Sequence, residues 1–402
     1  MSDGIRVVHY EQHYQDQLPE AVSDFNVANA EKVNAFHRSF PEYQPTPMAN
    51  LSELAEKLGV AGIYVKDESF RFGLKAFKVL GGSYCLGRYI AKQLNTDISE
   101  LPYNVMTSDE VRQKIGDITF VTATDGNHGR GIAWTANRLK QKSVVYMPKG
   151  SSQERLSNIR ALGSDAKITD LSYDDAVRYA SEMAEKNDWV LVQDTSWDGY
   201  EKIPRWIMQG YTSMGIEILN QLQGIVPTHI FLQAGVGAMS GAMTGFFRDA
   251  FRDNKQPVIT IVEPDKADCI YRTAEARDGK LHCVTEEMNT IMAGLACGKP
   301  CTIGWNVLKD CADNFVSMTD SVAAQGMRIL GNSLPGDPKV ISGESGAAGF
   351  GFVSEVLRRP ELSPLKNELG LNEESIILCI STEGDTDREN YRRIVWDGAY
   401  TV

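Results

Sequence analysis

The sequence predicts an α/β protein in two domains, with open, twisted and mostly parallel sheets flanked by helices. Two observations indicate this fold class. Short runs rich in β-branched residues alternate with stretches of helical periodicity, and 402 residues are enough for two domains of ordinary size. Strands separated by helices of this length form βαβ units, whose right-handed crossovers give a parallel sheet covered on both faces.

Each predicted element is a segment that shows one of these two patterns. The predicted strands are Gly62–Lys66, Ile118–Ala123, Ser143–Met147, Trp189–Gln193, Thr228–Gln233, Val258–Val262, Phe315–Met318 and Ile376–Ile380. The predicted helices are Leu51–Leu58, Gly131–Lys140, Ser152–Leu162, Tyr173–Lys186 and Tyr211–Gln221, with another near Val22–Arg38 in an N-terminal extension of residues 1–45. Ligands of such sheets bind beyond the carboxyl ends of the strands, so the loops there are the candidate site.

Composition and charge exclude several classes of partner. The net charge of −12 argues against binding to nucleic acid and to anionic membrane surfaces, which both require basic patches. No apolar segment approaches the roughly 20 residues needed to span a bilayer, and the N-terminus shows no secretory signal. The seven cysteines are odd in number and scattered, which is typical of a reduced cytoplasmic protein.

We expect no metal site. His9 and His13 are four residues apart and could share a helix face as metal ligands, but no third ligand is near them in the sequence, so two exposed histidines are the better interpretation. Four cysteines at positions 269, 283, 297 and 301 lie closer together than the rest, yet they form no C-x-x-C pair.

Two loops at predicted strand ends carry polar residues that suit a cofactor. Lys78 follows the strand Gly62–Lys66 and a polar loop, and by itself it could be a solvated surface lysine. The glycine-rich loop after Ile118–Ala123 contains Asp125 and Asn127. Its glycines allow close approach to a ligand, and the Asn127 amide can donate to a phenolate-like oxygen. An ordinary strand-to-helix turn is the alternative for this loop.

Two further loops complete the set. The third contains Gly235, Val236, Gly237, Ala238 and Met239, after the apolar strand Thr228–Gln233. A glycine loop that opens a helix is a phosphate cradle, but this one lacks the third glycine of a dinucleotide site and the G-K-[ST] of a P-loop. The fourth begins with Ser381 and Thr382, whose hydroxyls could bind a ring nitrogen, although in isolation it is a polar turn.

Together these loops resemble the fold-type II pyridoxal phosphate enzymes, the group of threonine dehydratase, serine racemase and the tryptophan synthase β chain. The resemblance runs from about Pro45 to Asp387 and keeps the order of that group's motifs. The matching segments are Pro45–Met48 (T-P-L), Val65–Glu68 (K-x-E), Ala76–Lys78 (S-F-K), Asp125–Gly129 (S-G-N-H-G), Gly235–Met239 (phosphate loop) and Ser381–Asp387 (S-G-R-G-D-K-D). The resemblance implies that Lys78 forms the Schiff base, Asn127 contacts the pyridoxal 3′-oxygen and Ser381, or else Thr382, meets the ring nitrogen.

Two departures from the motifs indicate the substrate. Ala76 stands where serine is usual, and Asp125 replaces the small residue that commonly precedes Gly-Asn-His. A carboxylate near the substrate favours a cationic side chain through charge-assisted hydrogen bonding. The segments Arg71–Lys78, Gln193–Tyr200, Ile203–Tyr211 and Ser381–Asp387 resemble the diaminopropionate ammonia-lyase family in particular. That resemblance implies a cytoplasmic homodimer acting on both isomers of 2,3-diaminopropionate.

The expected chemistry is an elimination that releases pyruvate and two ammonia molecules. Lys78 is the predicted base for the L-isomer and Asp125 for the D-isomer, which presents its proton to the other face. Asp194, at the end of the strand Trp189–Gln193, is predicted to orient the β-ammonium or to support Asp125, with a helix cap or surface turn as its alternative. The loop Ser342–Gly346 is expected near the cofactor.

Two other functions stay open. A serine or threonine dehydratase shares the cofactor chemistry and differs in the leaving group, and a non-catalytic protein could bind the cofactor without reaction. The family pattern also implies the domains: a large domain of residues 1–88 and 215–402, with a smaller domain of residues 89–214 inserted into it.

Overall fold

The computed structural model describes residues 4–10, 18–124 and 126–401. The chain forms two compact units. The first unit contains Met1–Asn26, Pro45–Ala76 and Glu217–Val402, and the second contains Val27–Gln44 and Phe77–Ile216. These limits differ from the expected inserted segment, residues 89–214. Residue 89 lies inside the continuous helix α3 (Val79–Leu94), and the whole of this helix groups with the second unit.

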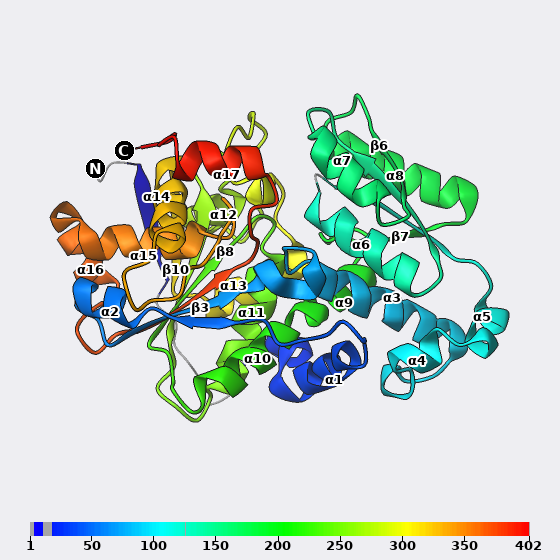
Figure 1. Ribbon diagram of the computed structural model, residues 1–402, viewed down its shortest axis with the longest axis horizontal. Helices are drawn as coiled ribbons and strands as arrows, with labels where there is room; N and C mark the ends of the chain where they lie inside the picture. The colour runs from blue at the N-terminus through cyan, green and yellow to red at the C-terminus, as the bar shows by residue number, and fades with distance from the viewer. Residues whose placement is uncertain (1–3, 11–17, 125, 402) are drawn as a thin grey trace. The chain divides into compact units, whose positions relative to one another are not determined.

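The first unit is built on a seven-stranded, mostly parallel sheet (Figure 1). Its spatial order is β1 (Ile5–His9), β10 (Asn314–Met318), β9 (Val258–Pro264), β8 (His229–Gln233), β11 (Ile376–Ser381), β3 (Gly62–Asp67) and β2 (Met48–Asn50). The five inner strands run parallel, and the two edge strands β1 and β2 are antiparallel to their neighbours. The carboxyl ends of β3, β8 and β11 therefore meet at one edge of this sheet.

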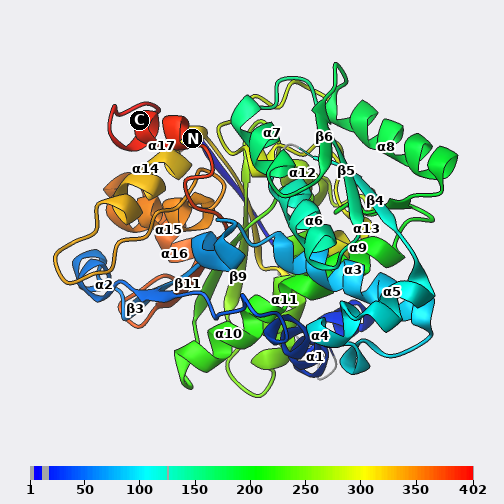
Figure 2. The ribbon, with the colours of Figure 1, turned by 45° about the vertical axis from the view of Figure 1, so that its right-hand side comes forward.

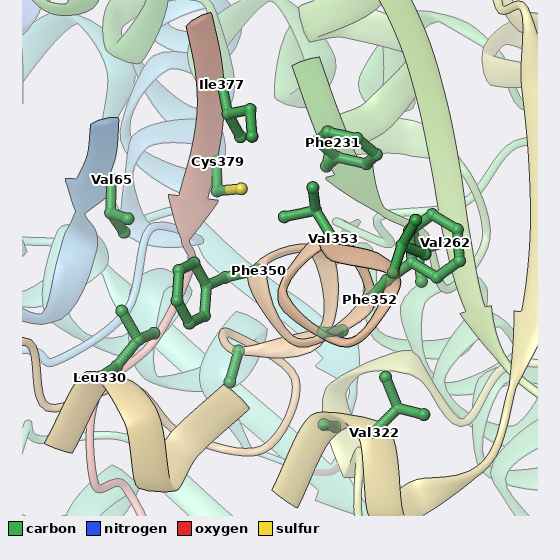
Figure 3. Packing of buried hydrophobic residues seen from close by; sticks show 14 of the residues in the cluster. Val65, Phe231, Val262, Val322, Leu330, Phe350, Phe352, Val353, Ile377 and Cys379 are labelled. Atoms are coloured by element: carbon green, nitrogen blue, oxygen red, sulfur yellow. The ribbon is translucent and has the colours of Figure 1, made fainter. Parts of the chain in front are cut away.

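Helices bury the sheet of the first unit. They are α2 (Ser52–Leu58), α10 (Ser213–Leu222, whose first four residues group with the second unit), α11 (Ala238–Ala250), α12 (Cys269–Ala276), α13 (Thr302–Cys311), α14 (Asp320–Gly331), α15 (Ala348–Arg358), α16 (Ser363–Glu368) and α17 (Arg388–Val395). Figure 3 shows Phe350, Phe352 and Val353 of α15 packed between the strands and the residues of α14. These side chains are fully buried, and such burial is the main source of stability in the fold.

The second unit has a four-stranded parallel sheet (Figure 2). Its order is β6 (Asp165–Ile168), β5 (Lys142–Met147), β4 (Thr119–Ala123) and β7 (Val190–Leu191). Alternate residues of a strand face opposite sides. Accordingly, Val144 packs in the cluster that contains α8 (Tyr173–Asn187), whereas Val145 packs with α6 (Asn127–Arg138) and α7 (Gln153–Arg160). The remaining helices of this unit are α1 (Val27–Arg38), α3, α4 (Tyr103–Met106), α5 (Asp109–Ile115) and α9 (Lys202–Tyr211).

The predicted α/β class with mostly parallel sheets is confirmed, and most element errors are local. The strand expected over Trp189–Gln193 is only two residues long. The helix expected over Tyr211–Gln221 is present as α10, which begins two residues later, at Ser213, because α9 ends at Tyr211. The edge strands β1 and β2 and the polar strand β6 were not predicted, since short strands with few apolar residues resemble loops.

Two kinds of feature were looked for among the described residues, a membrane-crossing helix and a cluster of metal ligands. None of the described helices is both long and apolar enough to cross a membrane. Among the residues with a described position, no group of three or more histidine, cysteine, aspartate or glutamate side chains is arranged to hold a metal ion. His9 lies in β1, with Nδ1 2.7 Å from Asn314 Oδ1, and His13 lies outside the described residues.

A fully buried ionic network supports the carboxyl end of β3. The Arg71 guanidinium donates to both carboxylate oxygens of Glu217, at 2.7 and 2.8 Å, and to both of Glu68, at 2.8 Å each. Lys66 Nζ donates to Glu217 Oε2 at 2.7 Å. Burial alone would raise the pKa of the Glu217 carboxyl, but Arg71 and Lys66 lower it to about 2. The Glu217 carboxyl is therefore ionised at neutral pH, and the network pairs two acidic side chains with two basic ones.

Replacement of Glu217 by glutamine is expected to lower the free energy of unfolding by about 3–5 kcal/mol, because it leaves buried cations without a counter-charge. The loss should be constant above pH 4.5, where Glu217 is ionised in both folded and unfolded wild-type chains. It should shrink as the pH falls from 4.5 toward 2, because Glu217 is then protonated in the unfolded wild-type chain while it stays ionised in the folded one, which lowers the stability of the wild type. Urea unfolding across this pH range measures the difference, with Glu56→Gln on the exposed face of α2 as the control. A loss that stays constant down to pH 2 would contradict the assignment.

Candidate active site

Lys78 directly precedes α3 in the second unit. Its backbone lies against α6, where Gly131 permits a close approach: a Cβ on Gly131 would be 2.9 Å from Val79 Cα and 3.2 Å from the Lys78 carbonyl carbon. Because real Cβ atoms do not come this close to backbone, a larger residue at position 131 would displace one of the two helices. Gly131 thereby sets the position of the Lys78 backbone.

The Lys78 side chain contacts Asp194. Lys78 Nζ donates to Asp194 Oδ2 at 2.6 Å. Asp194 follows β7 and is buried. Burial by itself would raise the pKa of this carboxyl, but the positive charges of His128 and Lys78, together with the hydrogen bond from Lys78, hold the pKa well below its ordinary value. Asp194 is thus a buried carboxylate that stays ionised at neutral pH.

His128 is the second neighbour of Asp194. Its Nδ1 lies 3.8 Å from Asp194 Oδ2, and its Nε2 donates to the Val192 carbonyl at 2.9 Å. Because a carbonyl oxygen only accepts, the Nε2 atom carries a proton. This bond orients the imidazole so that Nδ1 faces the carboxylate. His128 belongs to the predicted motif Asp125–Gly129, but no role was predicted for it. Only the fold brings it close to Asp194.

The glycine-rich loop after β4 leads into the N-terminus of α6. Asn127 is the first residue of α6 and is half-buried. Before it, the Gly126 N–H donates to Thr124 Oγ1 at 3.1 Å, which helps to close the turn. Asp125 lies outside the described residues, so its predicted role is not placed by the structure.

The predicted phosphate loop has the features that a phosphate needs. Gly237 is the N-cap of α11, with φ of 86°, a left-handed conformation that favours glycine. The backbone N–H groups of Gly235, Val236 and Gly237 donate to no backbone carbonyl within the described part of the chain. The hydroxyl of Ser240, in the first turn of α11, is buried and has no partner among the described residues. These donors, at the positive end of a helix dipole, fit a phosphate group.

The hydroxyls after β11 join this loop at the same sheet edge. Gln233, the last residue of β8, donates from Nε2 to Thr382 Oγ1 at 2.9 Å and to the Ile380 carbonyl at 2.9 Å. Ser381 Oγ donates to Ser342 Oγ at 2.7 Å. The loop Ser342–Gly346 therefore lies directly against the residues predicted to meet the ring nitrogen, as the Gly343 N–H bond to the Glu383 carbonyl also shows.

Comparison with known proteins identifies the family. The family model described as "Pyridoxal-phosphate dependent enzyme" matches residues 40–367. Diaminopropionate ammonia-lyase of Salmonella typhimurium is 50% identical over 382 residues, which cover 94% of each chain. The chain belongs to the diaminopropionate ammonia-lyase family. This membership confirms the family predicted from the motifs and, with it, the pyridoxal phosphate class of cofactor.

Solved structures of this family share the fold of the whole chain. The holo diaminopropionate ammonia-lyase of Escherichia coli is 45% identical, with a TM-score of 0.91 over 99% of this chain and 98% of that one. The same Escherichia coli enzyme in complex with an aminoacrylate-PLP azomethine reaction intermediate is 44% identical, with a TM-score of 0.90 and the same coverage. The fold-type II architecture predicted from the sequence is therefore confirmed.

The predicted site residues of this diaminopropionate ammonia-lyase family member fall into two described groups. In the second unit the structure brings Lys78 and Asp194 together, with Asn127 at the start of α6. In the first unit it brings the Gly235 loop, Ser381 and Thr382 to adjacent strand ends. Gln233 was not predicted as a site residue, and Ser342 was predicted only as part of a loop near the cofactor, without a contact of its own. The sequence pattern that could have indicated them is a polar residue at or near the end of a buried strand. Many ordinary turns show the same pattern, so it does not single out a site.

Proposed function

We propose that this protein is a pyridoxal-phosphate-dependent lyase that removes ammonia from D- and L-2,3-diaminopropionate. The overall reaction consumes one water and yields pyruvate and two ammonia molecules. Family membership supports the proposal, and the observation that carries it is the buried, ionised Asp194 carboxylate on Lys78. Such an anion in a partly dry site binds a cationic side chain through a charge-assisted bond, which is stronger than the hydrogen bond that it can accept from a neutral hydroxyl.

The residues present fit the cofactor. Lys78 would bond its aldehyde carbon, Asn127 its 3′-oxygen, and the N–H groups of Gly235 to Met239 its phosphate. Two hydroxyls are predicted for the ring nitrogen. Thr382 Oγ1 accepts a hydrogen bond from Gln233 and so keeps its own proton available, whereas the Ser381 hydroxyl already donates its proton in a hydrogen bond to Ser342 Oγ. When bound, pyridoxal phosphate withdraws electrons from the substrate Cα and makes its proton removable.

The proton steps belong to residues of this chain. Released as an amine, Lys78 removes the Cα proton of the L-isomer, and Asp125 removes that of the D-isomer from the other face. Asp194, freed from its ion pair when Lys78 loses its charge, can receive the β-ammonium of the substrate. Departure of the β-nitrogen as ammonia leaves an enamine, which tautomerises and is hydrolysed by water to pyruvate and the second ammonia.

An assay of 2-oxo acid release tests this function, because both diaminopropionate isomers and serine would yield pyruvate and threonine would yield 2-oxobutyrate. It compares D- and L-2,3-diaminopropionate with serine and threonine, at equal protein and saturating cofactor. We expect both diaminopropionate isomers to be the best substrates. Faster turnover of serine or threonine would make the protein a dehydratase, and cofactor binding without release of a 2-oxo acid from any of them would make it a non-catalytic binder. Either result overturns the proposal.

Asp194→Asn is expected to reduce kcat/KM for L-2,3-diaminopropionate about 100-fold, because loss of one partner of a buried charge pair costs about 2–5 kcal/mol. A smaller loss is expected with serine, which has no side-chain charge to pair. Steady-state kinetics with both substrates measures the contrast. Asp198→Asn is the matched control, since Asp198 is an exposed carboxylate in the same loop. Equal losses with the two substrates would show that Asp194 does not recognise the β-ammonium.

We also infer a cytoplasmic homodimer, as the family resemblance implies. The net charge of −12 and the lack of a membrane-crossing helix in the described part of the chain are in keeping with it. Light scattering coupled to size-exclusion chromatography measures the assembly. A mass of twice the chain's 44.5 kDa is expected, and a monomer mass would contradict the inference.

A further inference from the structure

The segment that leads to Lys78 is strained. We call residues 68–76 the lysine arm, because it runs from the end of β3 to two residues before Lys78. Within it Phe72 has φ of 48° and Lys75 has φ of 59°, both left-handed, on either side of Gly73 at 71°. A residue other than glycine is disfavoured in this conformation and persists there only where the surroundings hold it.

One end of the lysine arm is held by the buried ionic network described above. Arg71 is fully buried between the carboxylates of Glu68 and Glu217 and cannot shift without separating them. The strained residues follow Arg71 directly. The network thus fixes the position of the first residues of the lysine arm but does not hold its last residues.

The other end is held by the loop that carries the predicted ring-nitrogen partners. Lys75 Nζ donates to Asp385 Oδ1 at 2.6 Å, and the Lys75 carbonyl accepts from the Gly384 N–H at 2.9 Å. Ala76 forms an isolated antiparallel bridge with Glu383. Three contacts in succession thus join residues 75–76 to residues 383–385, directly after Ser381 and Thr382.

The Lys75–Asp385 pair is partly shielded from solvent. The two side chains are 32% and 25% exposed, and the charged atoms are at hydrogen-bond distance. The other cation near Asp385 is Arg388, whose Nε is 3.8 Å from Oδ2 and whose side chain is 72% exposed. Arg388 therefore provides a natural comparison: the same carboxylate, a similar charge, and no link to the lysine arm.

We propose that Lys75 and Asp385 are positioning residues, whose ion pair holds the strained lysine arm to the loop of Ser381 and Thr382 and so sets the approach of Lys78 to the cofactor. The inference rests on the proposed function, because it assumes that Lys78 bonds pyridoxal phosphate and that a hydroxyl of this loop meets its ring nitrogen. Neither residue of the pair needs to touch the cofactor.

The test uses Lys75→Gln, Asp385→Asn, the double variant, Lys75→Arg and the control Arg388→Gln. The first measurement is the dissociation constant of pyridoxal phosphate from each apoprotein, by fluorescence titration. Each single variant should raise it about tenfold, as expected for loss of a partly buried charge-assisted bond. The double variant should have the same dissociation constant as each single variant, since the two residues act as one unit. The dissociation constant of Lys75→Arg should stay near that of the wild type, and the dissociation constant of Arg388→Gln should stay within about twofold of it.

A second measurement reports on the arm without cofactor. Hydrogen–deuterium exchange of the apoproteins should speed up in residues 74–80 and 381–387 together for Lys75→Gln and Asp385→Asn, and in neither segment for Arg388→Gln. Unchanged exchange with an unchanged dissociation constant overturns the inference, and so do losses in the single variants that add in the double variant.

The outcome is separable from that of the proposed function. If the wild-type protein releases pyruvate and the Lys75 and Asp385 variants match it in both measurements, the positioning role fails alone. If the wild-type protein forms no covalent bond between Lys78 and the cofactor, the proposed function fails, while the exchange experiment still decides whether the pair holds the arm.

Discussion

Lys78→Ala is expected to abolish pyruvate release from both isomers of 2,3-diaminopropionate and to remove the visible absorbance of the lysine-bound cofactor. The variant loses the amine that bonds the cofactor and the proposed base for the L-isomer at once. Loss of the base alone accounts for up to about 10⁴-fold in rate, so the total loss should be about 10⁴-fold or more. Absorbance spectra and pyruvate release measure the two effects separately.

A matched lysine variant controls for the change in charge. Lys114 on α5 forms an exposed ion pair with Glu110, four residues earlier, and exposed pairs of this kind contribute little to stability. Lys114→Ala should therefore keep both the absorbance band and the rate. A visible band that survives in Lys78→Ala would remove Lys78 from the cofactor-bonding role.

Asp125→Asn is expected to reduce the rate with D-2,3-diaminopropionate by about 10²–10⁴-fold, the usual contribution of a general base. The L-isomer presents its proton to the face of Lys78, so its rate should fall far less. The amide has nearly the shape of the carboxylate but cannot accept the proton, which makes the comparison one of charge and basicity. Rates with each pure isomer give the ratio that decides the matter.

The ratio between isomers is informative even if the variant is partly impaired in general. Damage to folding or to cofactor binding lowers both rates by the same factor and leaves the ratio unchanged. Equal losses with the two isomers would show that Asp125 is not the base for one face. Asp198→Asn, a variant of an exposed carboxylate, should leave both rates and their ratio as in the wild type.

The ordered motifs made the cofactor class and the family predictable from sequence. Lys78, Asn127, the Gly235 loop and Ser381 each have an ordinary alternative, and their shared position at strand ends in the family's order is what removes it. Parallel topology also followed from sequence, because the alternation of strands and helices is local information. The family comparison and the folded sheets confirm both predictions.

The contacts of Asp194 could not be predicted, and they illustrate what local patterns lack. The sequence placed a carboxylate at a strand end and left open whether it capped a helix, faced water or served the substrate. Its partners Lys78 and His128 are 116 and 66 positions away, on the N-terminal ends of two different helices. Only the packing of α3 and α6, with Gly131 at their contact, brings these charges to one carboxylate.

The sequence by itself determined the fold class, the family and the residues that suit pyridoxal phosphate, because these depend on periodicity and on short motifs. The tertiary structure decided which charges meet: Lys78 with Asp194 and His128, Arg71 with Glu68 and Glu217, and Lys75 with Asp385. The physical reason is that an ion pair depends on distance in space and on burial. Both are properties of the packed chain, and neither can be seen in the spacing of residues along it.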